Sequence, residues 1–216
     1  MIVIIDYGMG NIGSILNMLI KIGAEAIISS DIADINKADK LILPGVGAFD
    51  NGMRNLENLG LLPILNKKVN QEKRPILGIC LGMQLFAKNS EEGNLKGLQW
   101  IAGEVKKFKF NNTQANLKIP HIGWNSITIT KQSYLFNNIN QNPRFYFVHS
   151  YHLICDDQHN ILAETHYGYN FVSAVHKDNI IGVQFHPEKS HKFGIELLKN
   201  FVNFKVLGSN LLTQQR

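Results

Sequence analysis

The residue best suited to chemistry is Cys80, which stands in the pattern G-x-C-x-G formed by Gly78-Ile79-Cys80-Leu81-Gly82. An apolar run precedes it and a helix-compatible run follows, which is the setting of a nucleophile elbow. Such a turn places the sulfur at a helix N-terminus, where the helix dipole and free N–H groups favour the thiolate. The N–H of Leu81 would then point toward an oxyanion. The motif alone leaves open a buried structural cysteine.

A thiol nucleophile needs a base, and the base needs a group that orients it. His186 stands in Phe185-His186-Pro187-Glu188, at the end of another apolar run. Residues i and i+2 of an extended segment lie on the same side, so Glu188 is expected to hold the ring of His186. An isolated His-Pro-Glu would more often be an edge histidine beside a solvated carboxylate. Together with Cys80, it predicts a Cys-His-Glu triad.

A glycine loop follows a third apolar run, at Pro44-Gly45-Val46-Gly47. Such a loop can turn backbone N–H groups toward the negative oxygen that develops in acyl transfer. Taken alone, the segment would more often be a plain turn between a strand and a helix. Its place at a strand end makes it a candidate oxyanion loop.

Apolar periodicity predicts the elements that must position these motifs. Continuous apolar runs predict strands at 2–5, 26–28, 41–43 and 76–80, and helical spacing predicts helices at 12–22 and over much of 50–70. This alternation is typical of a parallel sheet with helices on both faces. Ligands of such sheets bind at the carboxyl ends of the strands, where Cys80 and His186 are both expected.

After about residue 100 the predicted elements change character. They are short and β-like, with Asn, Gly and Asp between them, near 102–109, 121–129, 144–149, 161–165, 172–176 and 180–185. A last helix follows Ser190, a suitable N-cap. The predicted fold class is α/β, a mostly parallel central sheet flanked by helices with added antiparallel strands. A single domain is expected over 1–208, with a frayed polar tail at 209–216.

Composition narrows the class of protein. The 216 residues are 44% hydrophobic and 18% charged, which is a globular balance. Two cysteines cannot form a disulfide framework, and with no signal-peptide pattern they indicate a reducing, cytoplasmic setting. The sequence contains no run of 18 apolar residues, so no membrane span is expected. The net charge of +5 permits an anionic partner, but the basic-aromatic run at 106–110 is better explained as a solvated strand face, so no nucleic acid is expected.

The three motifs, in this order, resemble those of the class I, triad-type, glutamine amidotransferases. Further segments are similar to the glutaminase subunits of imidazole glycerol phosphate synthases, and the resemblance runs from residue 2 to about 204. The segments that carry it are Asp6–Asn11, Pro44–Phe49, Gly78–Leu85, Pro120–Asn125, Phe145–Tyr151 and His186–Ser190. The resemblance implies a flavodoxin-like core. It also implies hydrolysis of L-glutamine, with ammonia passed to a (β/α)8-barrel cyclase partner in a heterodimer of histidine biosynthesis.

The resemblance also implies roles for single residues. Cys80 would be the nucleophile, His186 the acid/base and Glu188 the orienting carboxylate. Oxyanion and glutamine contacts would come from Gly45, Val46, Gly47, Leu81, Gln84, Glu92, Ser150 and Tyr151. Lys189 and Asn11 match positions at the subunit interface. No cofactor is implied.

Two features depart from the family pattern or suggest other chemistry. His152 stands where the family often has an aromatic residue, near the glutamine site but outside the triad. The pair His149-x-x-His152 could suggest a metal, but no further ligand stands at a familiar spacing, so no metal is expected.

Two alternative functions remain open from the sequence. One is a paralogous amidotransferase that supplies ammonia for amidino-sugar synthesis on a surface polysaccharide, with a similar barrel partner. The other is a non-catalytic regulatory subunit, which the presence of Cys80, His186 and Glu188 disfavours.

Overall fold

A single mixed sheet contains the strands that the first apolar runs predict. The computed structural model describes residues 1–111, 117–139 and 142–205, and there eight strands pair in the order β2-β1-β3-β4-β12-β11-β10-β7. The bounds are β1 Ile2–Ile5, β2 Ala26–Ser29, β3 Lys40–Gly45, β4 Ile76–Cys80, β7 Thr128–Ile129, β10 Ile161–Tyr167, β11 Tyr169–Lys177 and β12 Ile180–Val183. The strands from β2 to β12 are parallel, in the flavodoxin-like order, and β11, β10 and β7 continue the sheet antiparallel.

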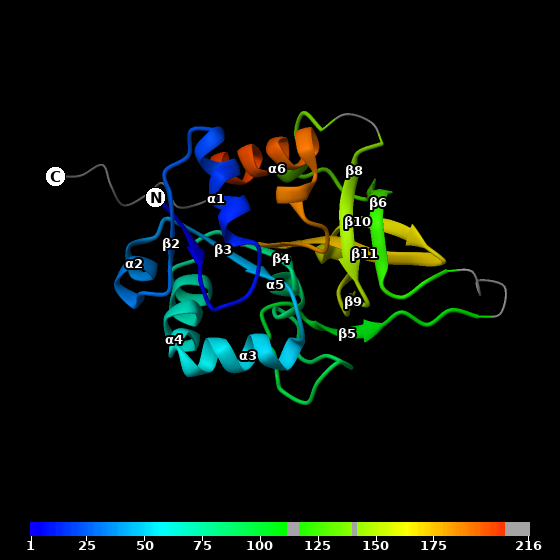
Figure 1. Ribbon diagram of the computed structural model, residues 1–216, viewed down its shortest axis with the longest axis horizontal. Coiled ribbons are helices and arrows are strands. Elements are labelled where there is room, and N and C mark those ends of the chain that lie inside the picture. The colour runs from blue at the N-terminus through cyan, green and yellow to red at the C-terminus, as the bar shows by residue number, and fades with distance from the viewer. Residues whose placement is uncertain (112–116, 140–141, 206–216) are drawn as a thin grey trace.

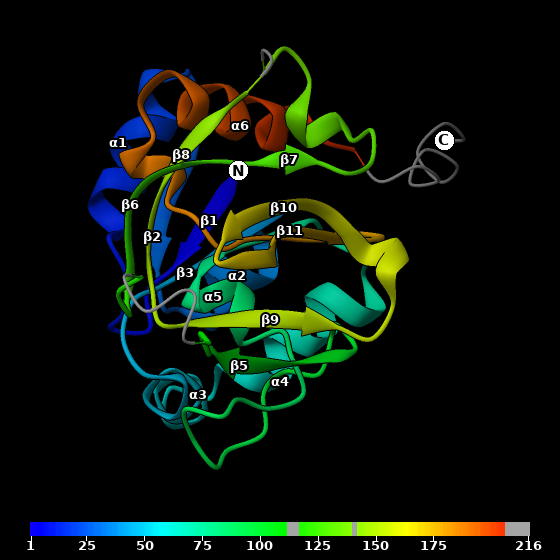
Figure 2. The ribbon, with the colours of Figure 1, turned by 90° about the vertical axis from the view of Figure 1, so that its right-hand side faces the viewer.

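Two small antiparallel pairs complete the predicted fold class. β5 (Gly103–Lys107) pairs with β9 (Tyr151–Cys155), and β6 (His121–Ser126) pairs with β8 (Arg144–His149). Figures 1 and 2 show both pairs near β10 and β11, toward the edge of the central sheet opposite to β2. The segments predicted near 102–109, 121–129 and 144–149 are therefore confirmed as strands, while β9 was not predicted.

Helices cover the two faces of the central sheet. Figure 1 shows α1 (Ile12–Lys21) and α6 (His191–Asn203) on one face, and α3 (Phe49–Asn58) and α4 (Leu61–Asn66) on the other. β5 and β9 share the core of α3 and α4, whereas β8 shares the core of α1 and α6. Shorter elements are α2 (Ile32–Lys37), α5 (Leu81–Gln84), a π-helical turn η1 (Lys67–Gln71) and the 3-10 turns η3 (Tyr134–Phe136), η4 (Gln158–Asn160) and η5 (Pro187–Lys189). The helix predicted over much of 50–70 is thus divided into α3, α4 and η1, and α2 was not predicted.

Burial on both faces explains why the parallel strands have continuous apolar sequences. In β1, Val3 and Ile5 belong to the core under α3 and α4, while Ile2 and Ile4 belong to the core under α1 and α6. Alternate residues of a strand point to opposite faces, so a strand covered on both sides needs apolar residues throughout.

The start of the last helix and the predicted end of the domain can also be compared with the structure. Ser190 stands at the N-cap position of α6, but its side chain caps no N–H there. The predicted N-cap position is confirmed, but the Ser190 Oγ donates to the His186 carbonyl at 2.6 Å and accepts from the Tyr146 N–H at 3.0 Å. The predicted domain limit at 208 and the tail at 209–216 lie outside the described residues.

Within the described part of the chain, no helix has the length and apolarity to span a membrane.

Candidate active site

Cys80 sits on a strained turn between β4 and α5. It is the last residue of β4 and the N-cap of α5, with φ of 54° and ψ of −111°, a conformation that non-glycine residues seldom adopt. Gly82 makes the sharp turn possible, because a Cβ there would lie 1.8 Å from the Leu43 carbonyl oxygen. At Gly78 a Cβ would lie 2.6 Å from the Phe86 ring. The predicted elbow geometry is therefore present.

The sulfur of Cys80 is enclosed by neighbouring strands. The residue is 5% exposed, and its Sγ receives a hydrogen bond from Gln184 Nε2 at 3.6 Å. The thiol faces the Val148 carbonyl oxygen, at the weak distance of 3.9 Å. Across β3 and β4, Gly45 pairs with Cys80, which places the glycine loop beside the sulfur.

His186 and Glu188 form a buried pair. His186 Nδ1 lies 2.8 Å from Glu188 Oε1, and both side chains are 1% exposed. The pairing was predicted, but its predicted geometry was wrong, because Glu188 lies in the 3-10 turn η5 rather than in an extended strand. The His186 N–H donates to the Tyr146 carbonyl at 2.9 Å, which anchors this turn to β8. Two interactions therefore position the imidazole: the backbone hydrogen bond of His186 to Tyr146, and the contact of its Nδ1 with Glu188.

The charge state of His186 depends on this pairing. Burial by itself lowers the pKa of the imidazole, but interactions with Cys80 and Glu188 outweigh it and raise the pKa to about 10. The second ring nitrogen, Nε2, is buried without a close hydrogen-bond partner among the described residues. A protonated ring held in this way can donate a proton to a group bound next to Cys80.

The candidate oxyanion loop is held at its base and exposed at its tip. Tyr7 Oη donates to the Pro44 carbonyl at 2.5 Å, and Tyr7 is 1% exposed. Gly45 is buried, and a Cβ there would lie 2.5 Å from Tyr7 Oη. Val46 is 42% exposed, and Gly47, with φ of 110°, is also exposed. Only the tip of the loop is therefore open to a bound ligand.

Glu92 supports the loop from its far end. Its Oε2 accepts a hydrogen bond from the N–H of Phe49, the first residue of α3, at 2.8 Å. Asp50, one residue later, accepts from the N–H groups of Asn94 and Leu95. The segment containing Glu92 is thereby clamped to the start of α3, directly after the glycine loop.

The structure brings Gln84 and Tyr151 together beneath Cys80. Gln84, 5% exposed, donates from Nε2 to the Tyr151 carbonyl at 2.9 Å and to Gln184 Oε1 at 3.0 Å. The Ser150 carbonyl accepts from the Phe108 N–H at 3.1 Å. Gln184 was missed from the sequence, although a polar residue two positions before His186 in an apolar run was a signal.

The two predicted interface residues lie outside the buried cluster. Lys189 is exposed, with its Nζ 5.6 Å from the centre of the Tyr146 ring. Asn11 is exposed at the N-cap of α1, where its side chain makes no capping bond. Leu81, the first residue of α5, is buried directly after Cys80.

The histidines that could suggest a metal have other partners. His149 Nδ1 contacts the Tyr151 carbonyl at 2.8 Å, and His149 Nε2 lies 3.0 Å from His121 Nδ1. His152, 4% exposed, pairs through Nε2 with Tyr169 Oη at 2.8 Å. No group of three or more potential metal-ligating side chains occurs among the residues that the structure describes.

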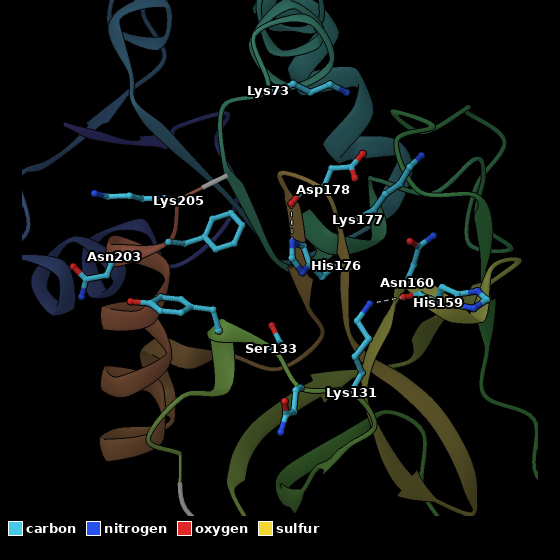
Figure 3. A pocket seen from close by; sticks show the side chains of 13 residues that line it. Lys73, Lys131, Ser133, His159, Asn160, His176, Lys177, Asp178, Asn203 and Lys205 are labelled. Atoms are coloured by element: carbon cyan, nitrogen blue, oxygen red, sulfur yellow. Dashed lines mark hydrogen bonds between the residues drawn. The ribbon is translucent and has the colours of Figure 1, made fainter. Parts of the chain in front are cut away.

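A cavity of about 1180 Å³ lies away from this cluster, near the starts of β4 and β12 (Figure 3). Four lysines surround it: Lys73, Lys131, Lys177 and Lys205. Neither Cys80 nor His186 lines it, and Cys80 stands at the opposite, carboxyl end of β4. This cavity is therefore separate from the candidate active site.

Known proteins match this chain along almost its whole length. The family model described as glutamine amidotransferase class-I matches residues 3–204. The "Imidazole glycerol phosphate synthase subunit HisH 2" of Methanococcus maripaludis is 61% identical over 202 residues, covering 94% of this chain and 98% of that protein. The protein of the same name in Pseudomonas aeruginosa is 48% identical, with the same coverage.

Solved structures show the same fold at low identity. The glutaminase domain of CTPS from Trypanosoma brucei superposes with a TM-score of 0.62 at 18% identity, covering 94% of this chain and 94% of that one. The fold, the family match and the relatives agree along the chain. The chain therefore belongs to the class-I glutamine amidotransferase family and, within it, to the HisH-type subunits of imidazole glycerol phosphate synthase.

Proposed function

We propose that this chain hydrolyses L-glutamine to glutamate and ammonia with the triad Cys80, His186 and Glu188. The observation that carries the proposal is the buried His186–Glu188 pair, 2.8 Å apart, beside a cysteine on a strained elbow. We further propose that the ammonia passes to a (β/α)8-barrel cyclase, in a cytoplasmic heterodimer that makes imidazole glycerol phosphate. The relatives named as HisH subunits support this pathway.

The chemistry follows from the positions of the groups. The Cys80 thiolate attacks the carboxamide carbon of glutamine, and the C=O electrons move onto oxygen. The N–H of Leu81 and those of the glycine loop hold the resulting oxyanion. When the C–N bond breaks, His186 gives its proton to the nitrogen, which leaves as ammonia. The product at this stage is a thioester between Cys80 and the glutamyl group.

The second half of the reaction uses His186 as a base. Neutral His186 takes a proton from water, the water oxygen attacks the thioester carbon, and the C–S bond breaks to release glutamate. Glu188 stabilises the imidazolium that forms and holds the ring in one orientation. Ammonia acts as a nucleophile only while unprotonated, which favours a water-poor path into a partner.

An apolar surface next to this site supports a protein partner. Strand β6 turns Ile122 and Trp124 outward, and these side chains are 59% and 39% exposed. The Trp124 ring stacks on His191 at 5.3 Å and meets the Tyr146 ring edge-on at 6.2 Å. Exposed aromatic residues that are already held in place are typical anchors of protein interfaces. With Lys189, they form the surface on which we propose that the barrel docks.

Glutamine hydrolysis measured with the cognate barrel protein tests the proposal. Glutamate release should be slow in the isolated chain and should rise when the partner and the histidine-pathway ribonucleotide are added. If the ribonucleotide neither binds nor stimulates, the histidine assignment is wrong. If glutamine is not hydrolysed under any of these conditions, the glutaminase assignment fails as well.

One observation favours keeping a second candidate function. The relatives from Methanococcus maripaludis and Pseudomonas aeruginosa are both numbered as HisH 2. A numbered copy is compatible with an amidotransferase that serves another acceptor, such as an amidino-sugar precursor of a surface polysaccharide. This candidate predicts partner-dependent glutamine hydrolysis that the histidine-pathway ribonucleotide does not stimulate. The same assay therefore separates the two functions.

A further inference from the structure

A buried amide that the proposed mechanism does not use lies against the sulfur of Cys80. Gln184 follows β12, is 0% exposed, and donates from Nε2 to Cys80 Sγ over 3.6 Å. Its Oε1 accepts from Gln84 Nε2 at 3.0 Å, and the same nitrogen donates to the Tyr151 carbonyl at 2.9 Å. These contacts form a relay that starts at a backbone carbonyl of β9 and ends on the sulfur.

The carbonyl at the start of the relay fixes which end of each amide faces the next group. A carbonyl oxygen can only accept, so Gln84 must present its NH2 group to Tyr151. The second hydrogen of that group meets Gln184, which must answer with its oxygen. The NH2 group of Gln184 is thereby directed at Cys80. Reversing either amide would set two donors or two acceptors against each other.

From this relay we infer that Gln184 is the buried donor that stabilises the Cys80 thiolate, and that Gln84 positions its amide. The inference rests on the proposed role of Cys80 as the nucleophile. A buried charge is costly unless it is hydrogen-bonded, and an N–H donor to an anion is a strong hydrogen bond. Gln84, which the family resemblance placed near the bound glutamine, acts here through Gln184.

Three other groups close to the sulfur differ in their effect on the thiolate. The Val148 carbonyl favours the thiol, because it can accept the S–H but repels a thiolate. Burial raises the pKa of Tyr7, and the nearby Cys80 charge raises it further, so Tyr7 stays neutral. His186 favours the thiolate when protonated, and Glu188 lies against the other nitrogen of its ring. Gln184 adds a donor that does not depend on protonation.

Alkylation of Cys80 by iodoacetamide, measured from pH 5 to pH 9 on the full chain, tests the inference. The reaction reports the thiolate directly and needs no hydrolysis of glutamine. The near-isosteric change Gln184→Met should slow alkylation about tenfold on the acid side of the profile. Cys155 contributes little, because burial and the adjacent acidic residues raise its pKa to about 12. Peptide mapping assigns the alkylated site.

Three further variants sharpen the result. Gln184→Glu sets a carboxylate against the sulfur and should slow alkylation more than Gln184→Met. Gln84→Leu frees the amide of Gln184 and should give a smaller effect in the same direction. Asn179→Leu is the matched control, because Asn179 is also 0% exposed and its amide donates to the Val69 and Arg74 carbonyls, just before β12. It should leave the profile unchanged.

The outcomes separate this inference from the proposed function. A folded Gln184→Met or Gln184→Glu protein with the wild-type profile overturns the inference, and so does an equal shift in Asn179→Leu. If wild-type protein with its partner hydrolyses glutamine while the Gln184 variants keep that profile, the proposed function stands and the inference fails. If wild-type protein hydrolyses no glutamine, the proposed function fails, while a shifted profile still supports the contact between Gln184 and Cys80.

Discussion

Replacing Glu188 by Gln removes the negative charge next to His186 while keeping the size of the side chain. The two side chains are 2.8 Å apart and 1% exposed, so water cannot take the place of the lost charge. A hydrogen bond to a charged group contributes roughly 1.5–3 kcal/mol net. The imidazolium that protonates the leaving nitrogen loses this stabilisation. We therefore expect kcat to fall about 10- to 100-fold.

The assay is glutamate release by the complex with its barrel partner, with kcat and KM determined separately from pH 6 to pH 9. KM should change little, because the carboxylate contacts the ring rather than the substrate. Glu188 helps to raise the pKa of His186, so in Glu188→Gln the imidazolium should be lost at a lower pH than in the wild type. Glu196→Gln, on α6 beside Lys199, is the charge-matched control.

Stability must be measured alongside activity in this variant. Glu188 Oε2 is buried without a hydrogen-bond partner among the described residues. An NH2 group in its place would be an unsatisfied donor and would cost about 1–3 kcal/mol of unfolding free energy. A folded Glu188→Gln enzyme whose kcat stays within about twofold of wild type at every pH would refute the reasoning.

Three other predictions follow from the same geometry. Gly82→Ala should cost about 2–4 kcal/mol of unfolding free energy, because the added Cβ would meet the Leu43 carbonyl oxygen. Gly13→Ala, with open space around the added Cβ, should instead stabilise the protein by about 0.5–1 kcal/mol. Urea denaturation measures both, and an unchanged unfolding free energy in Gly82→Ala would contradict the elbow geometry. Trp124→Ala should weaken binding of the barrel about tenfold or more in a titration, while the isolated protein stays folded with only a small loss of melting temperature from the lost contacts with His191 and Tyr146. An unchanged affinity would place the interface elsewhere. Protonated His186 should contribute stability that is fully present below its ordinary pKa of 6.5 and is lost as the pH rises to about 10. Over this range the unfolding free energy of the wild type should therefore fall more than that of His186→Asn. Equal falls in the two proteins would argue against the raised pKa of His186.

The strands that carry the site could be predicted because their sequences satisfy two buried faces at once. Runs such as Ile2–Ile5 and Ile76–Cys80 are too short for a typical helix, so they favour strands that are buried on both faces. The apolar run at 41–43 leads into Gly45 and the run at 76–80 ends at Cys80, so both ends were expected at one edge of the sheet, where the structure pairs them. The elbow was predictable because glycine flanks the cysteine on both sides.

The elements that were missed have weak local signals. α2 spans six residues with one fully buried side chain, Ile35, too little for a helical periodicity. β9 starts directly after Ser150, so the sequence shows no turn between it and β8. Glu188 meets His186 through a 3-10 turn, whose geometry depends on the bond from His186 to β8.

The relay to Cys80 could not be predicted, because it depends on three distant segments. Gln84, Tyr151 and Gln184 lie on α5, on β9 and after β12, and only the tertiary packing brings them together. A polar residue inside an apolar run signals a buried hydrogen bond, but it does not identify the partner.

The most direct test of the central claim is turnover by Cys80→Ala in the reconstituted complex with the barrel partner. Cys155→Ala, another buried cysteine away from the triad, is the matched control and should behave like wild type. Cys80→Ala should form no cyclised product from glutamine, yet it should form product at the wild-type rate when ammonium salt supplies free ammonia. Undiminished turnover with glutamine in Cys80→Ala would contradict the assignment of Cys80 as the nucleophile.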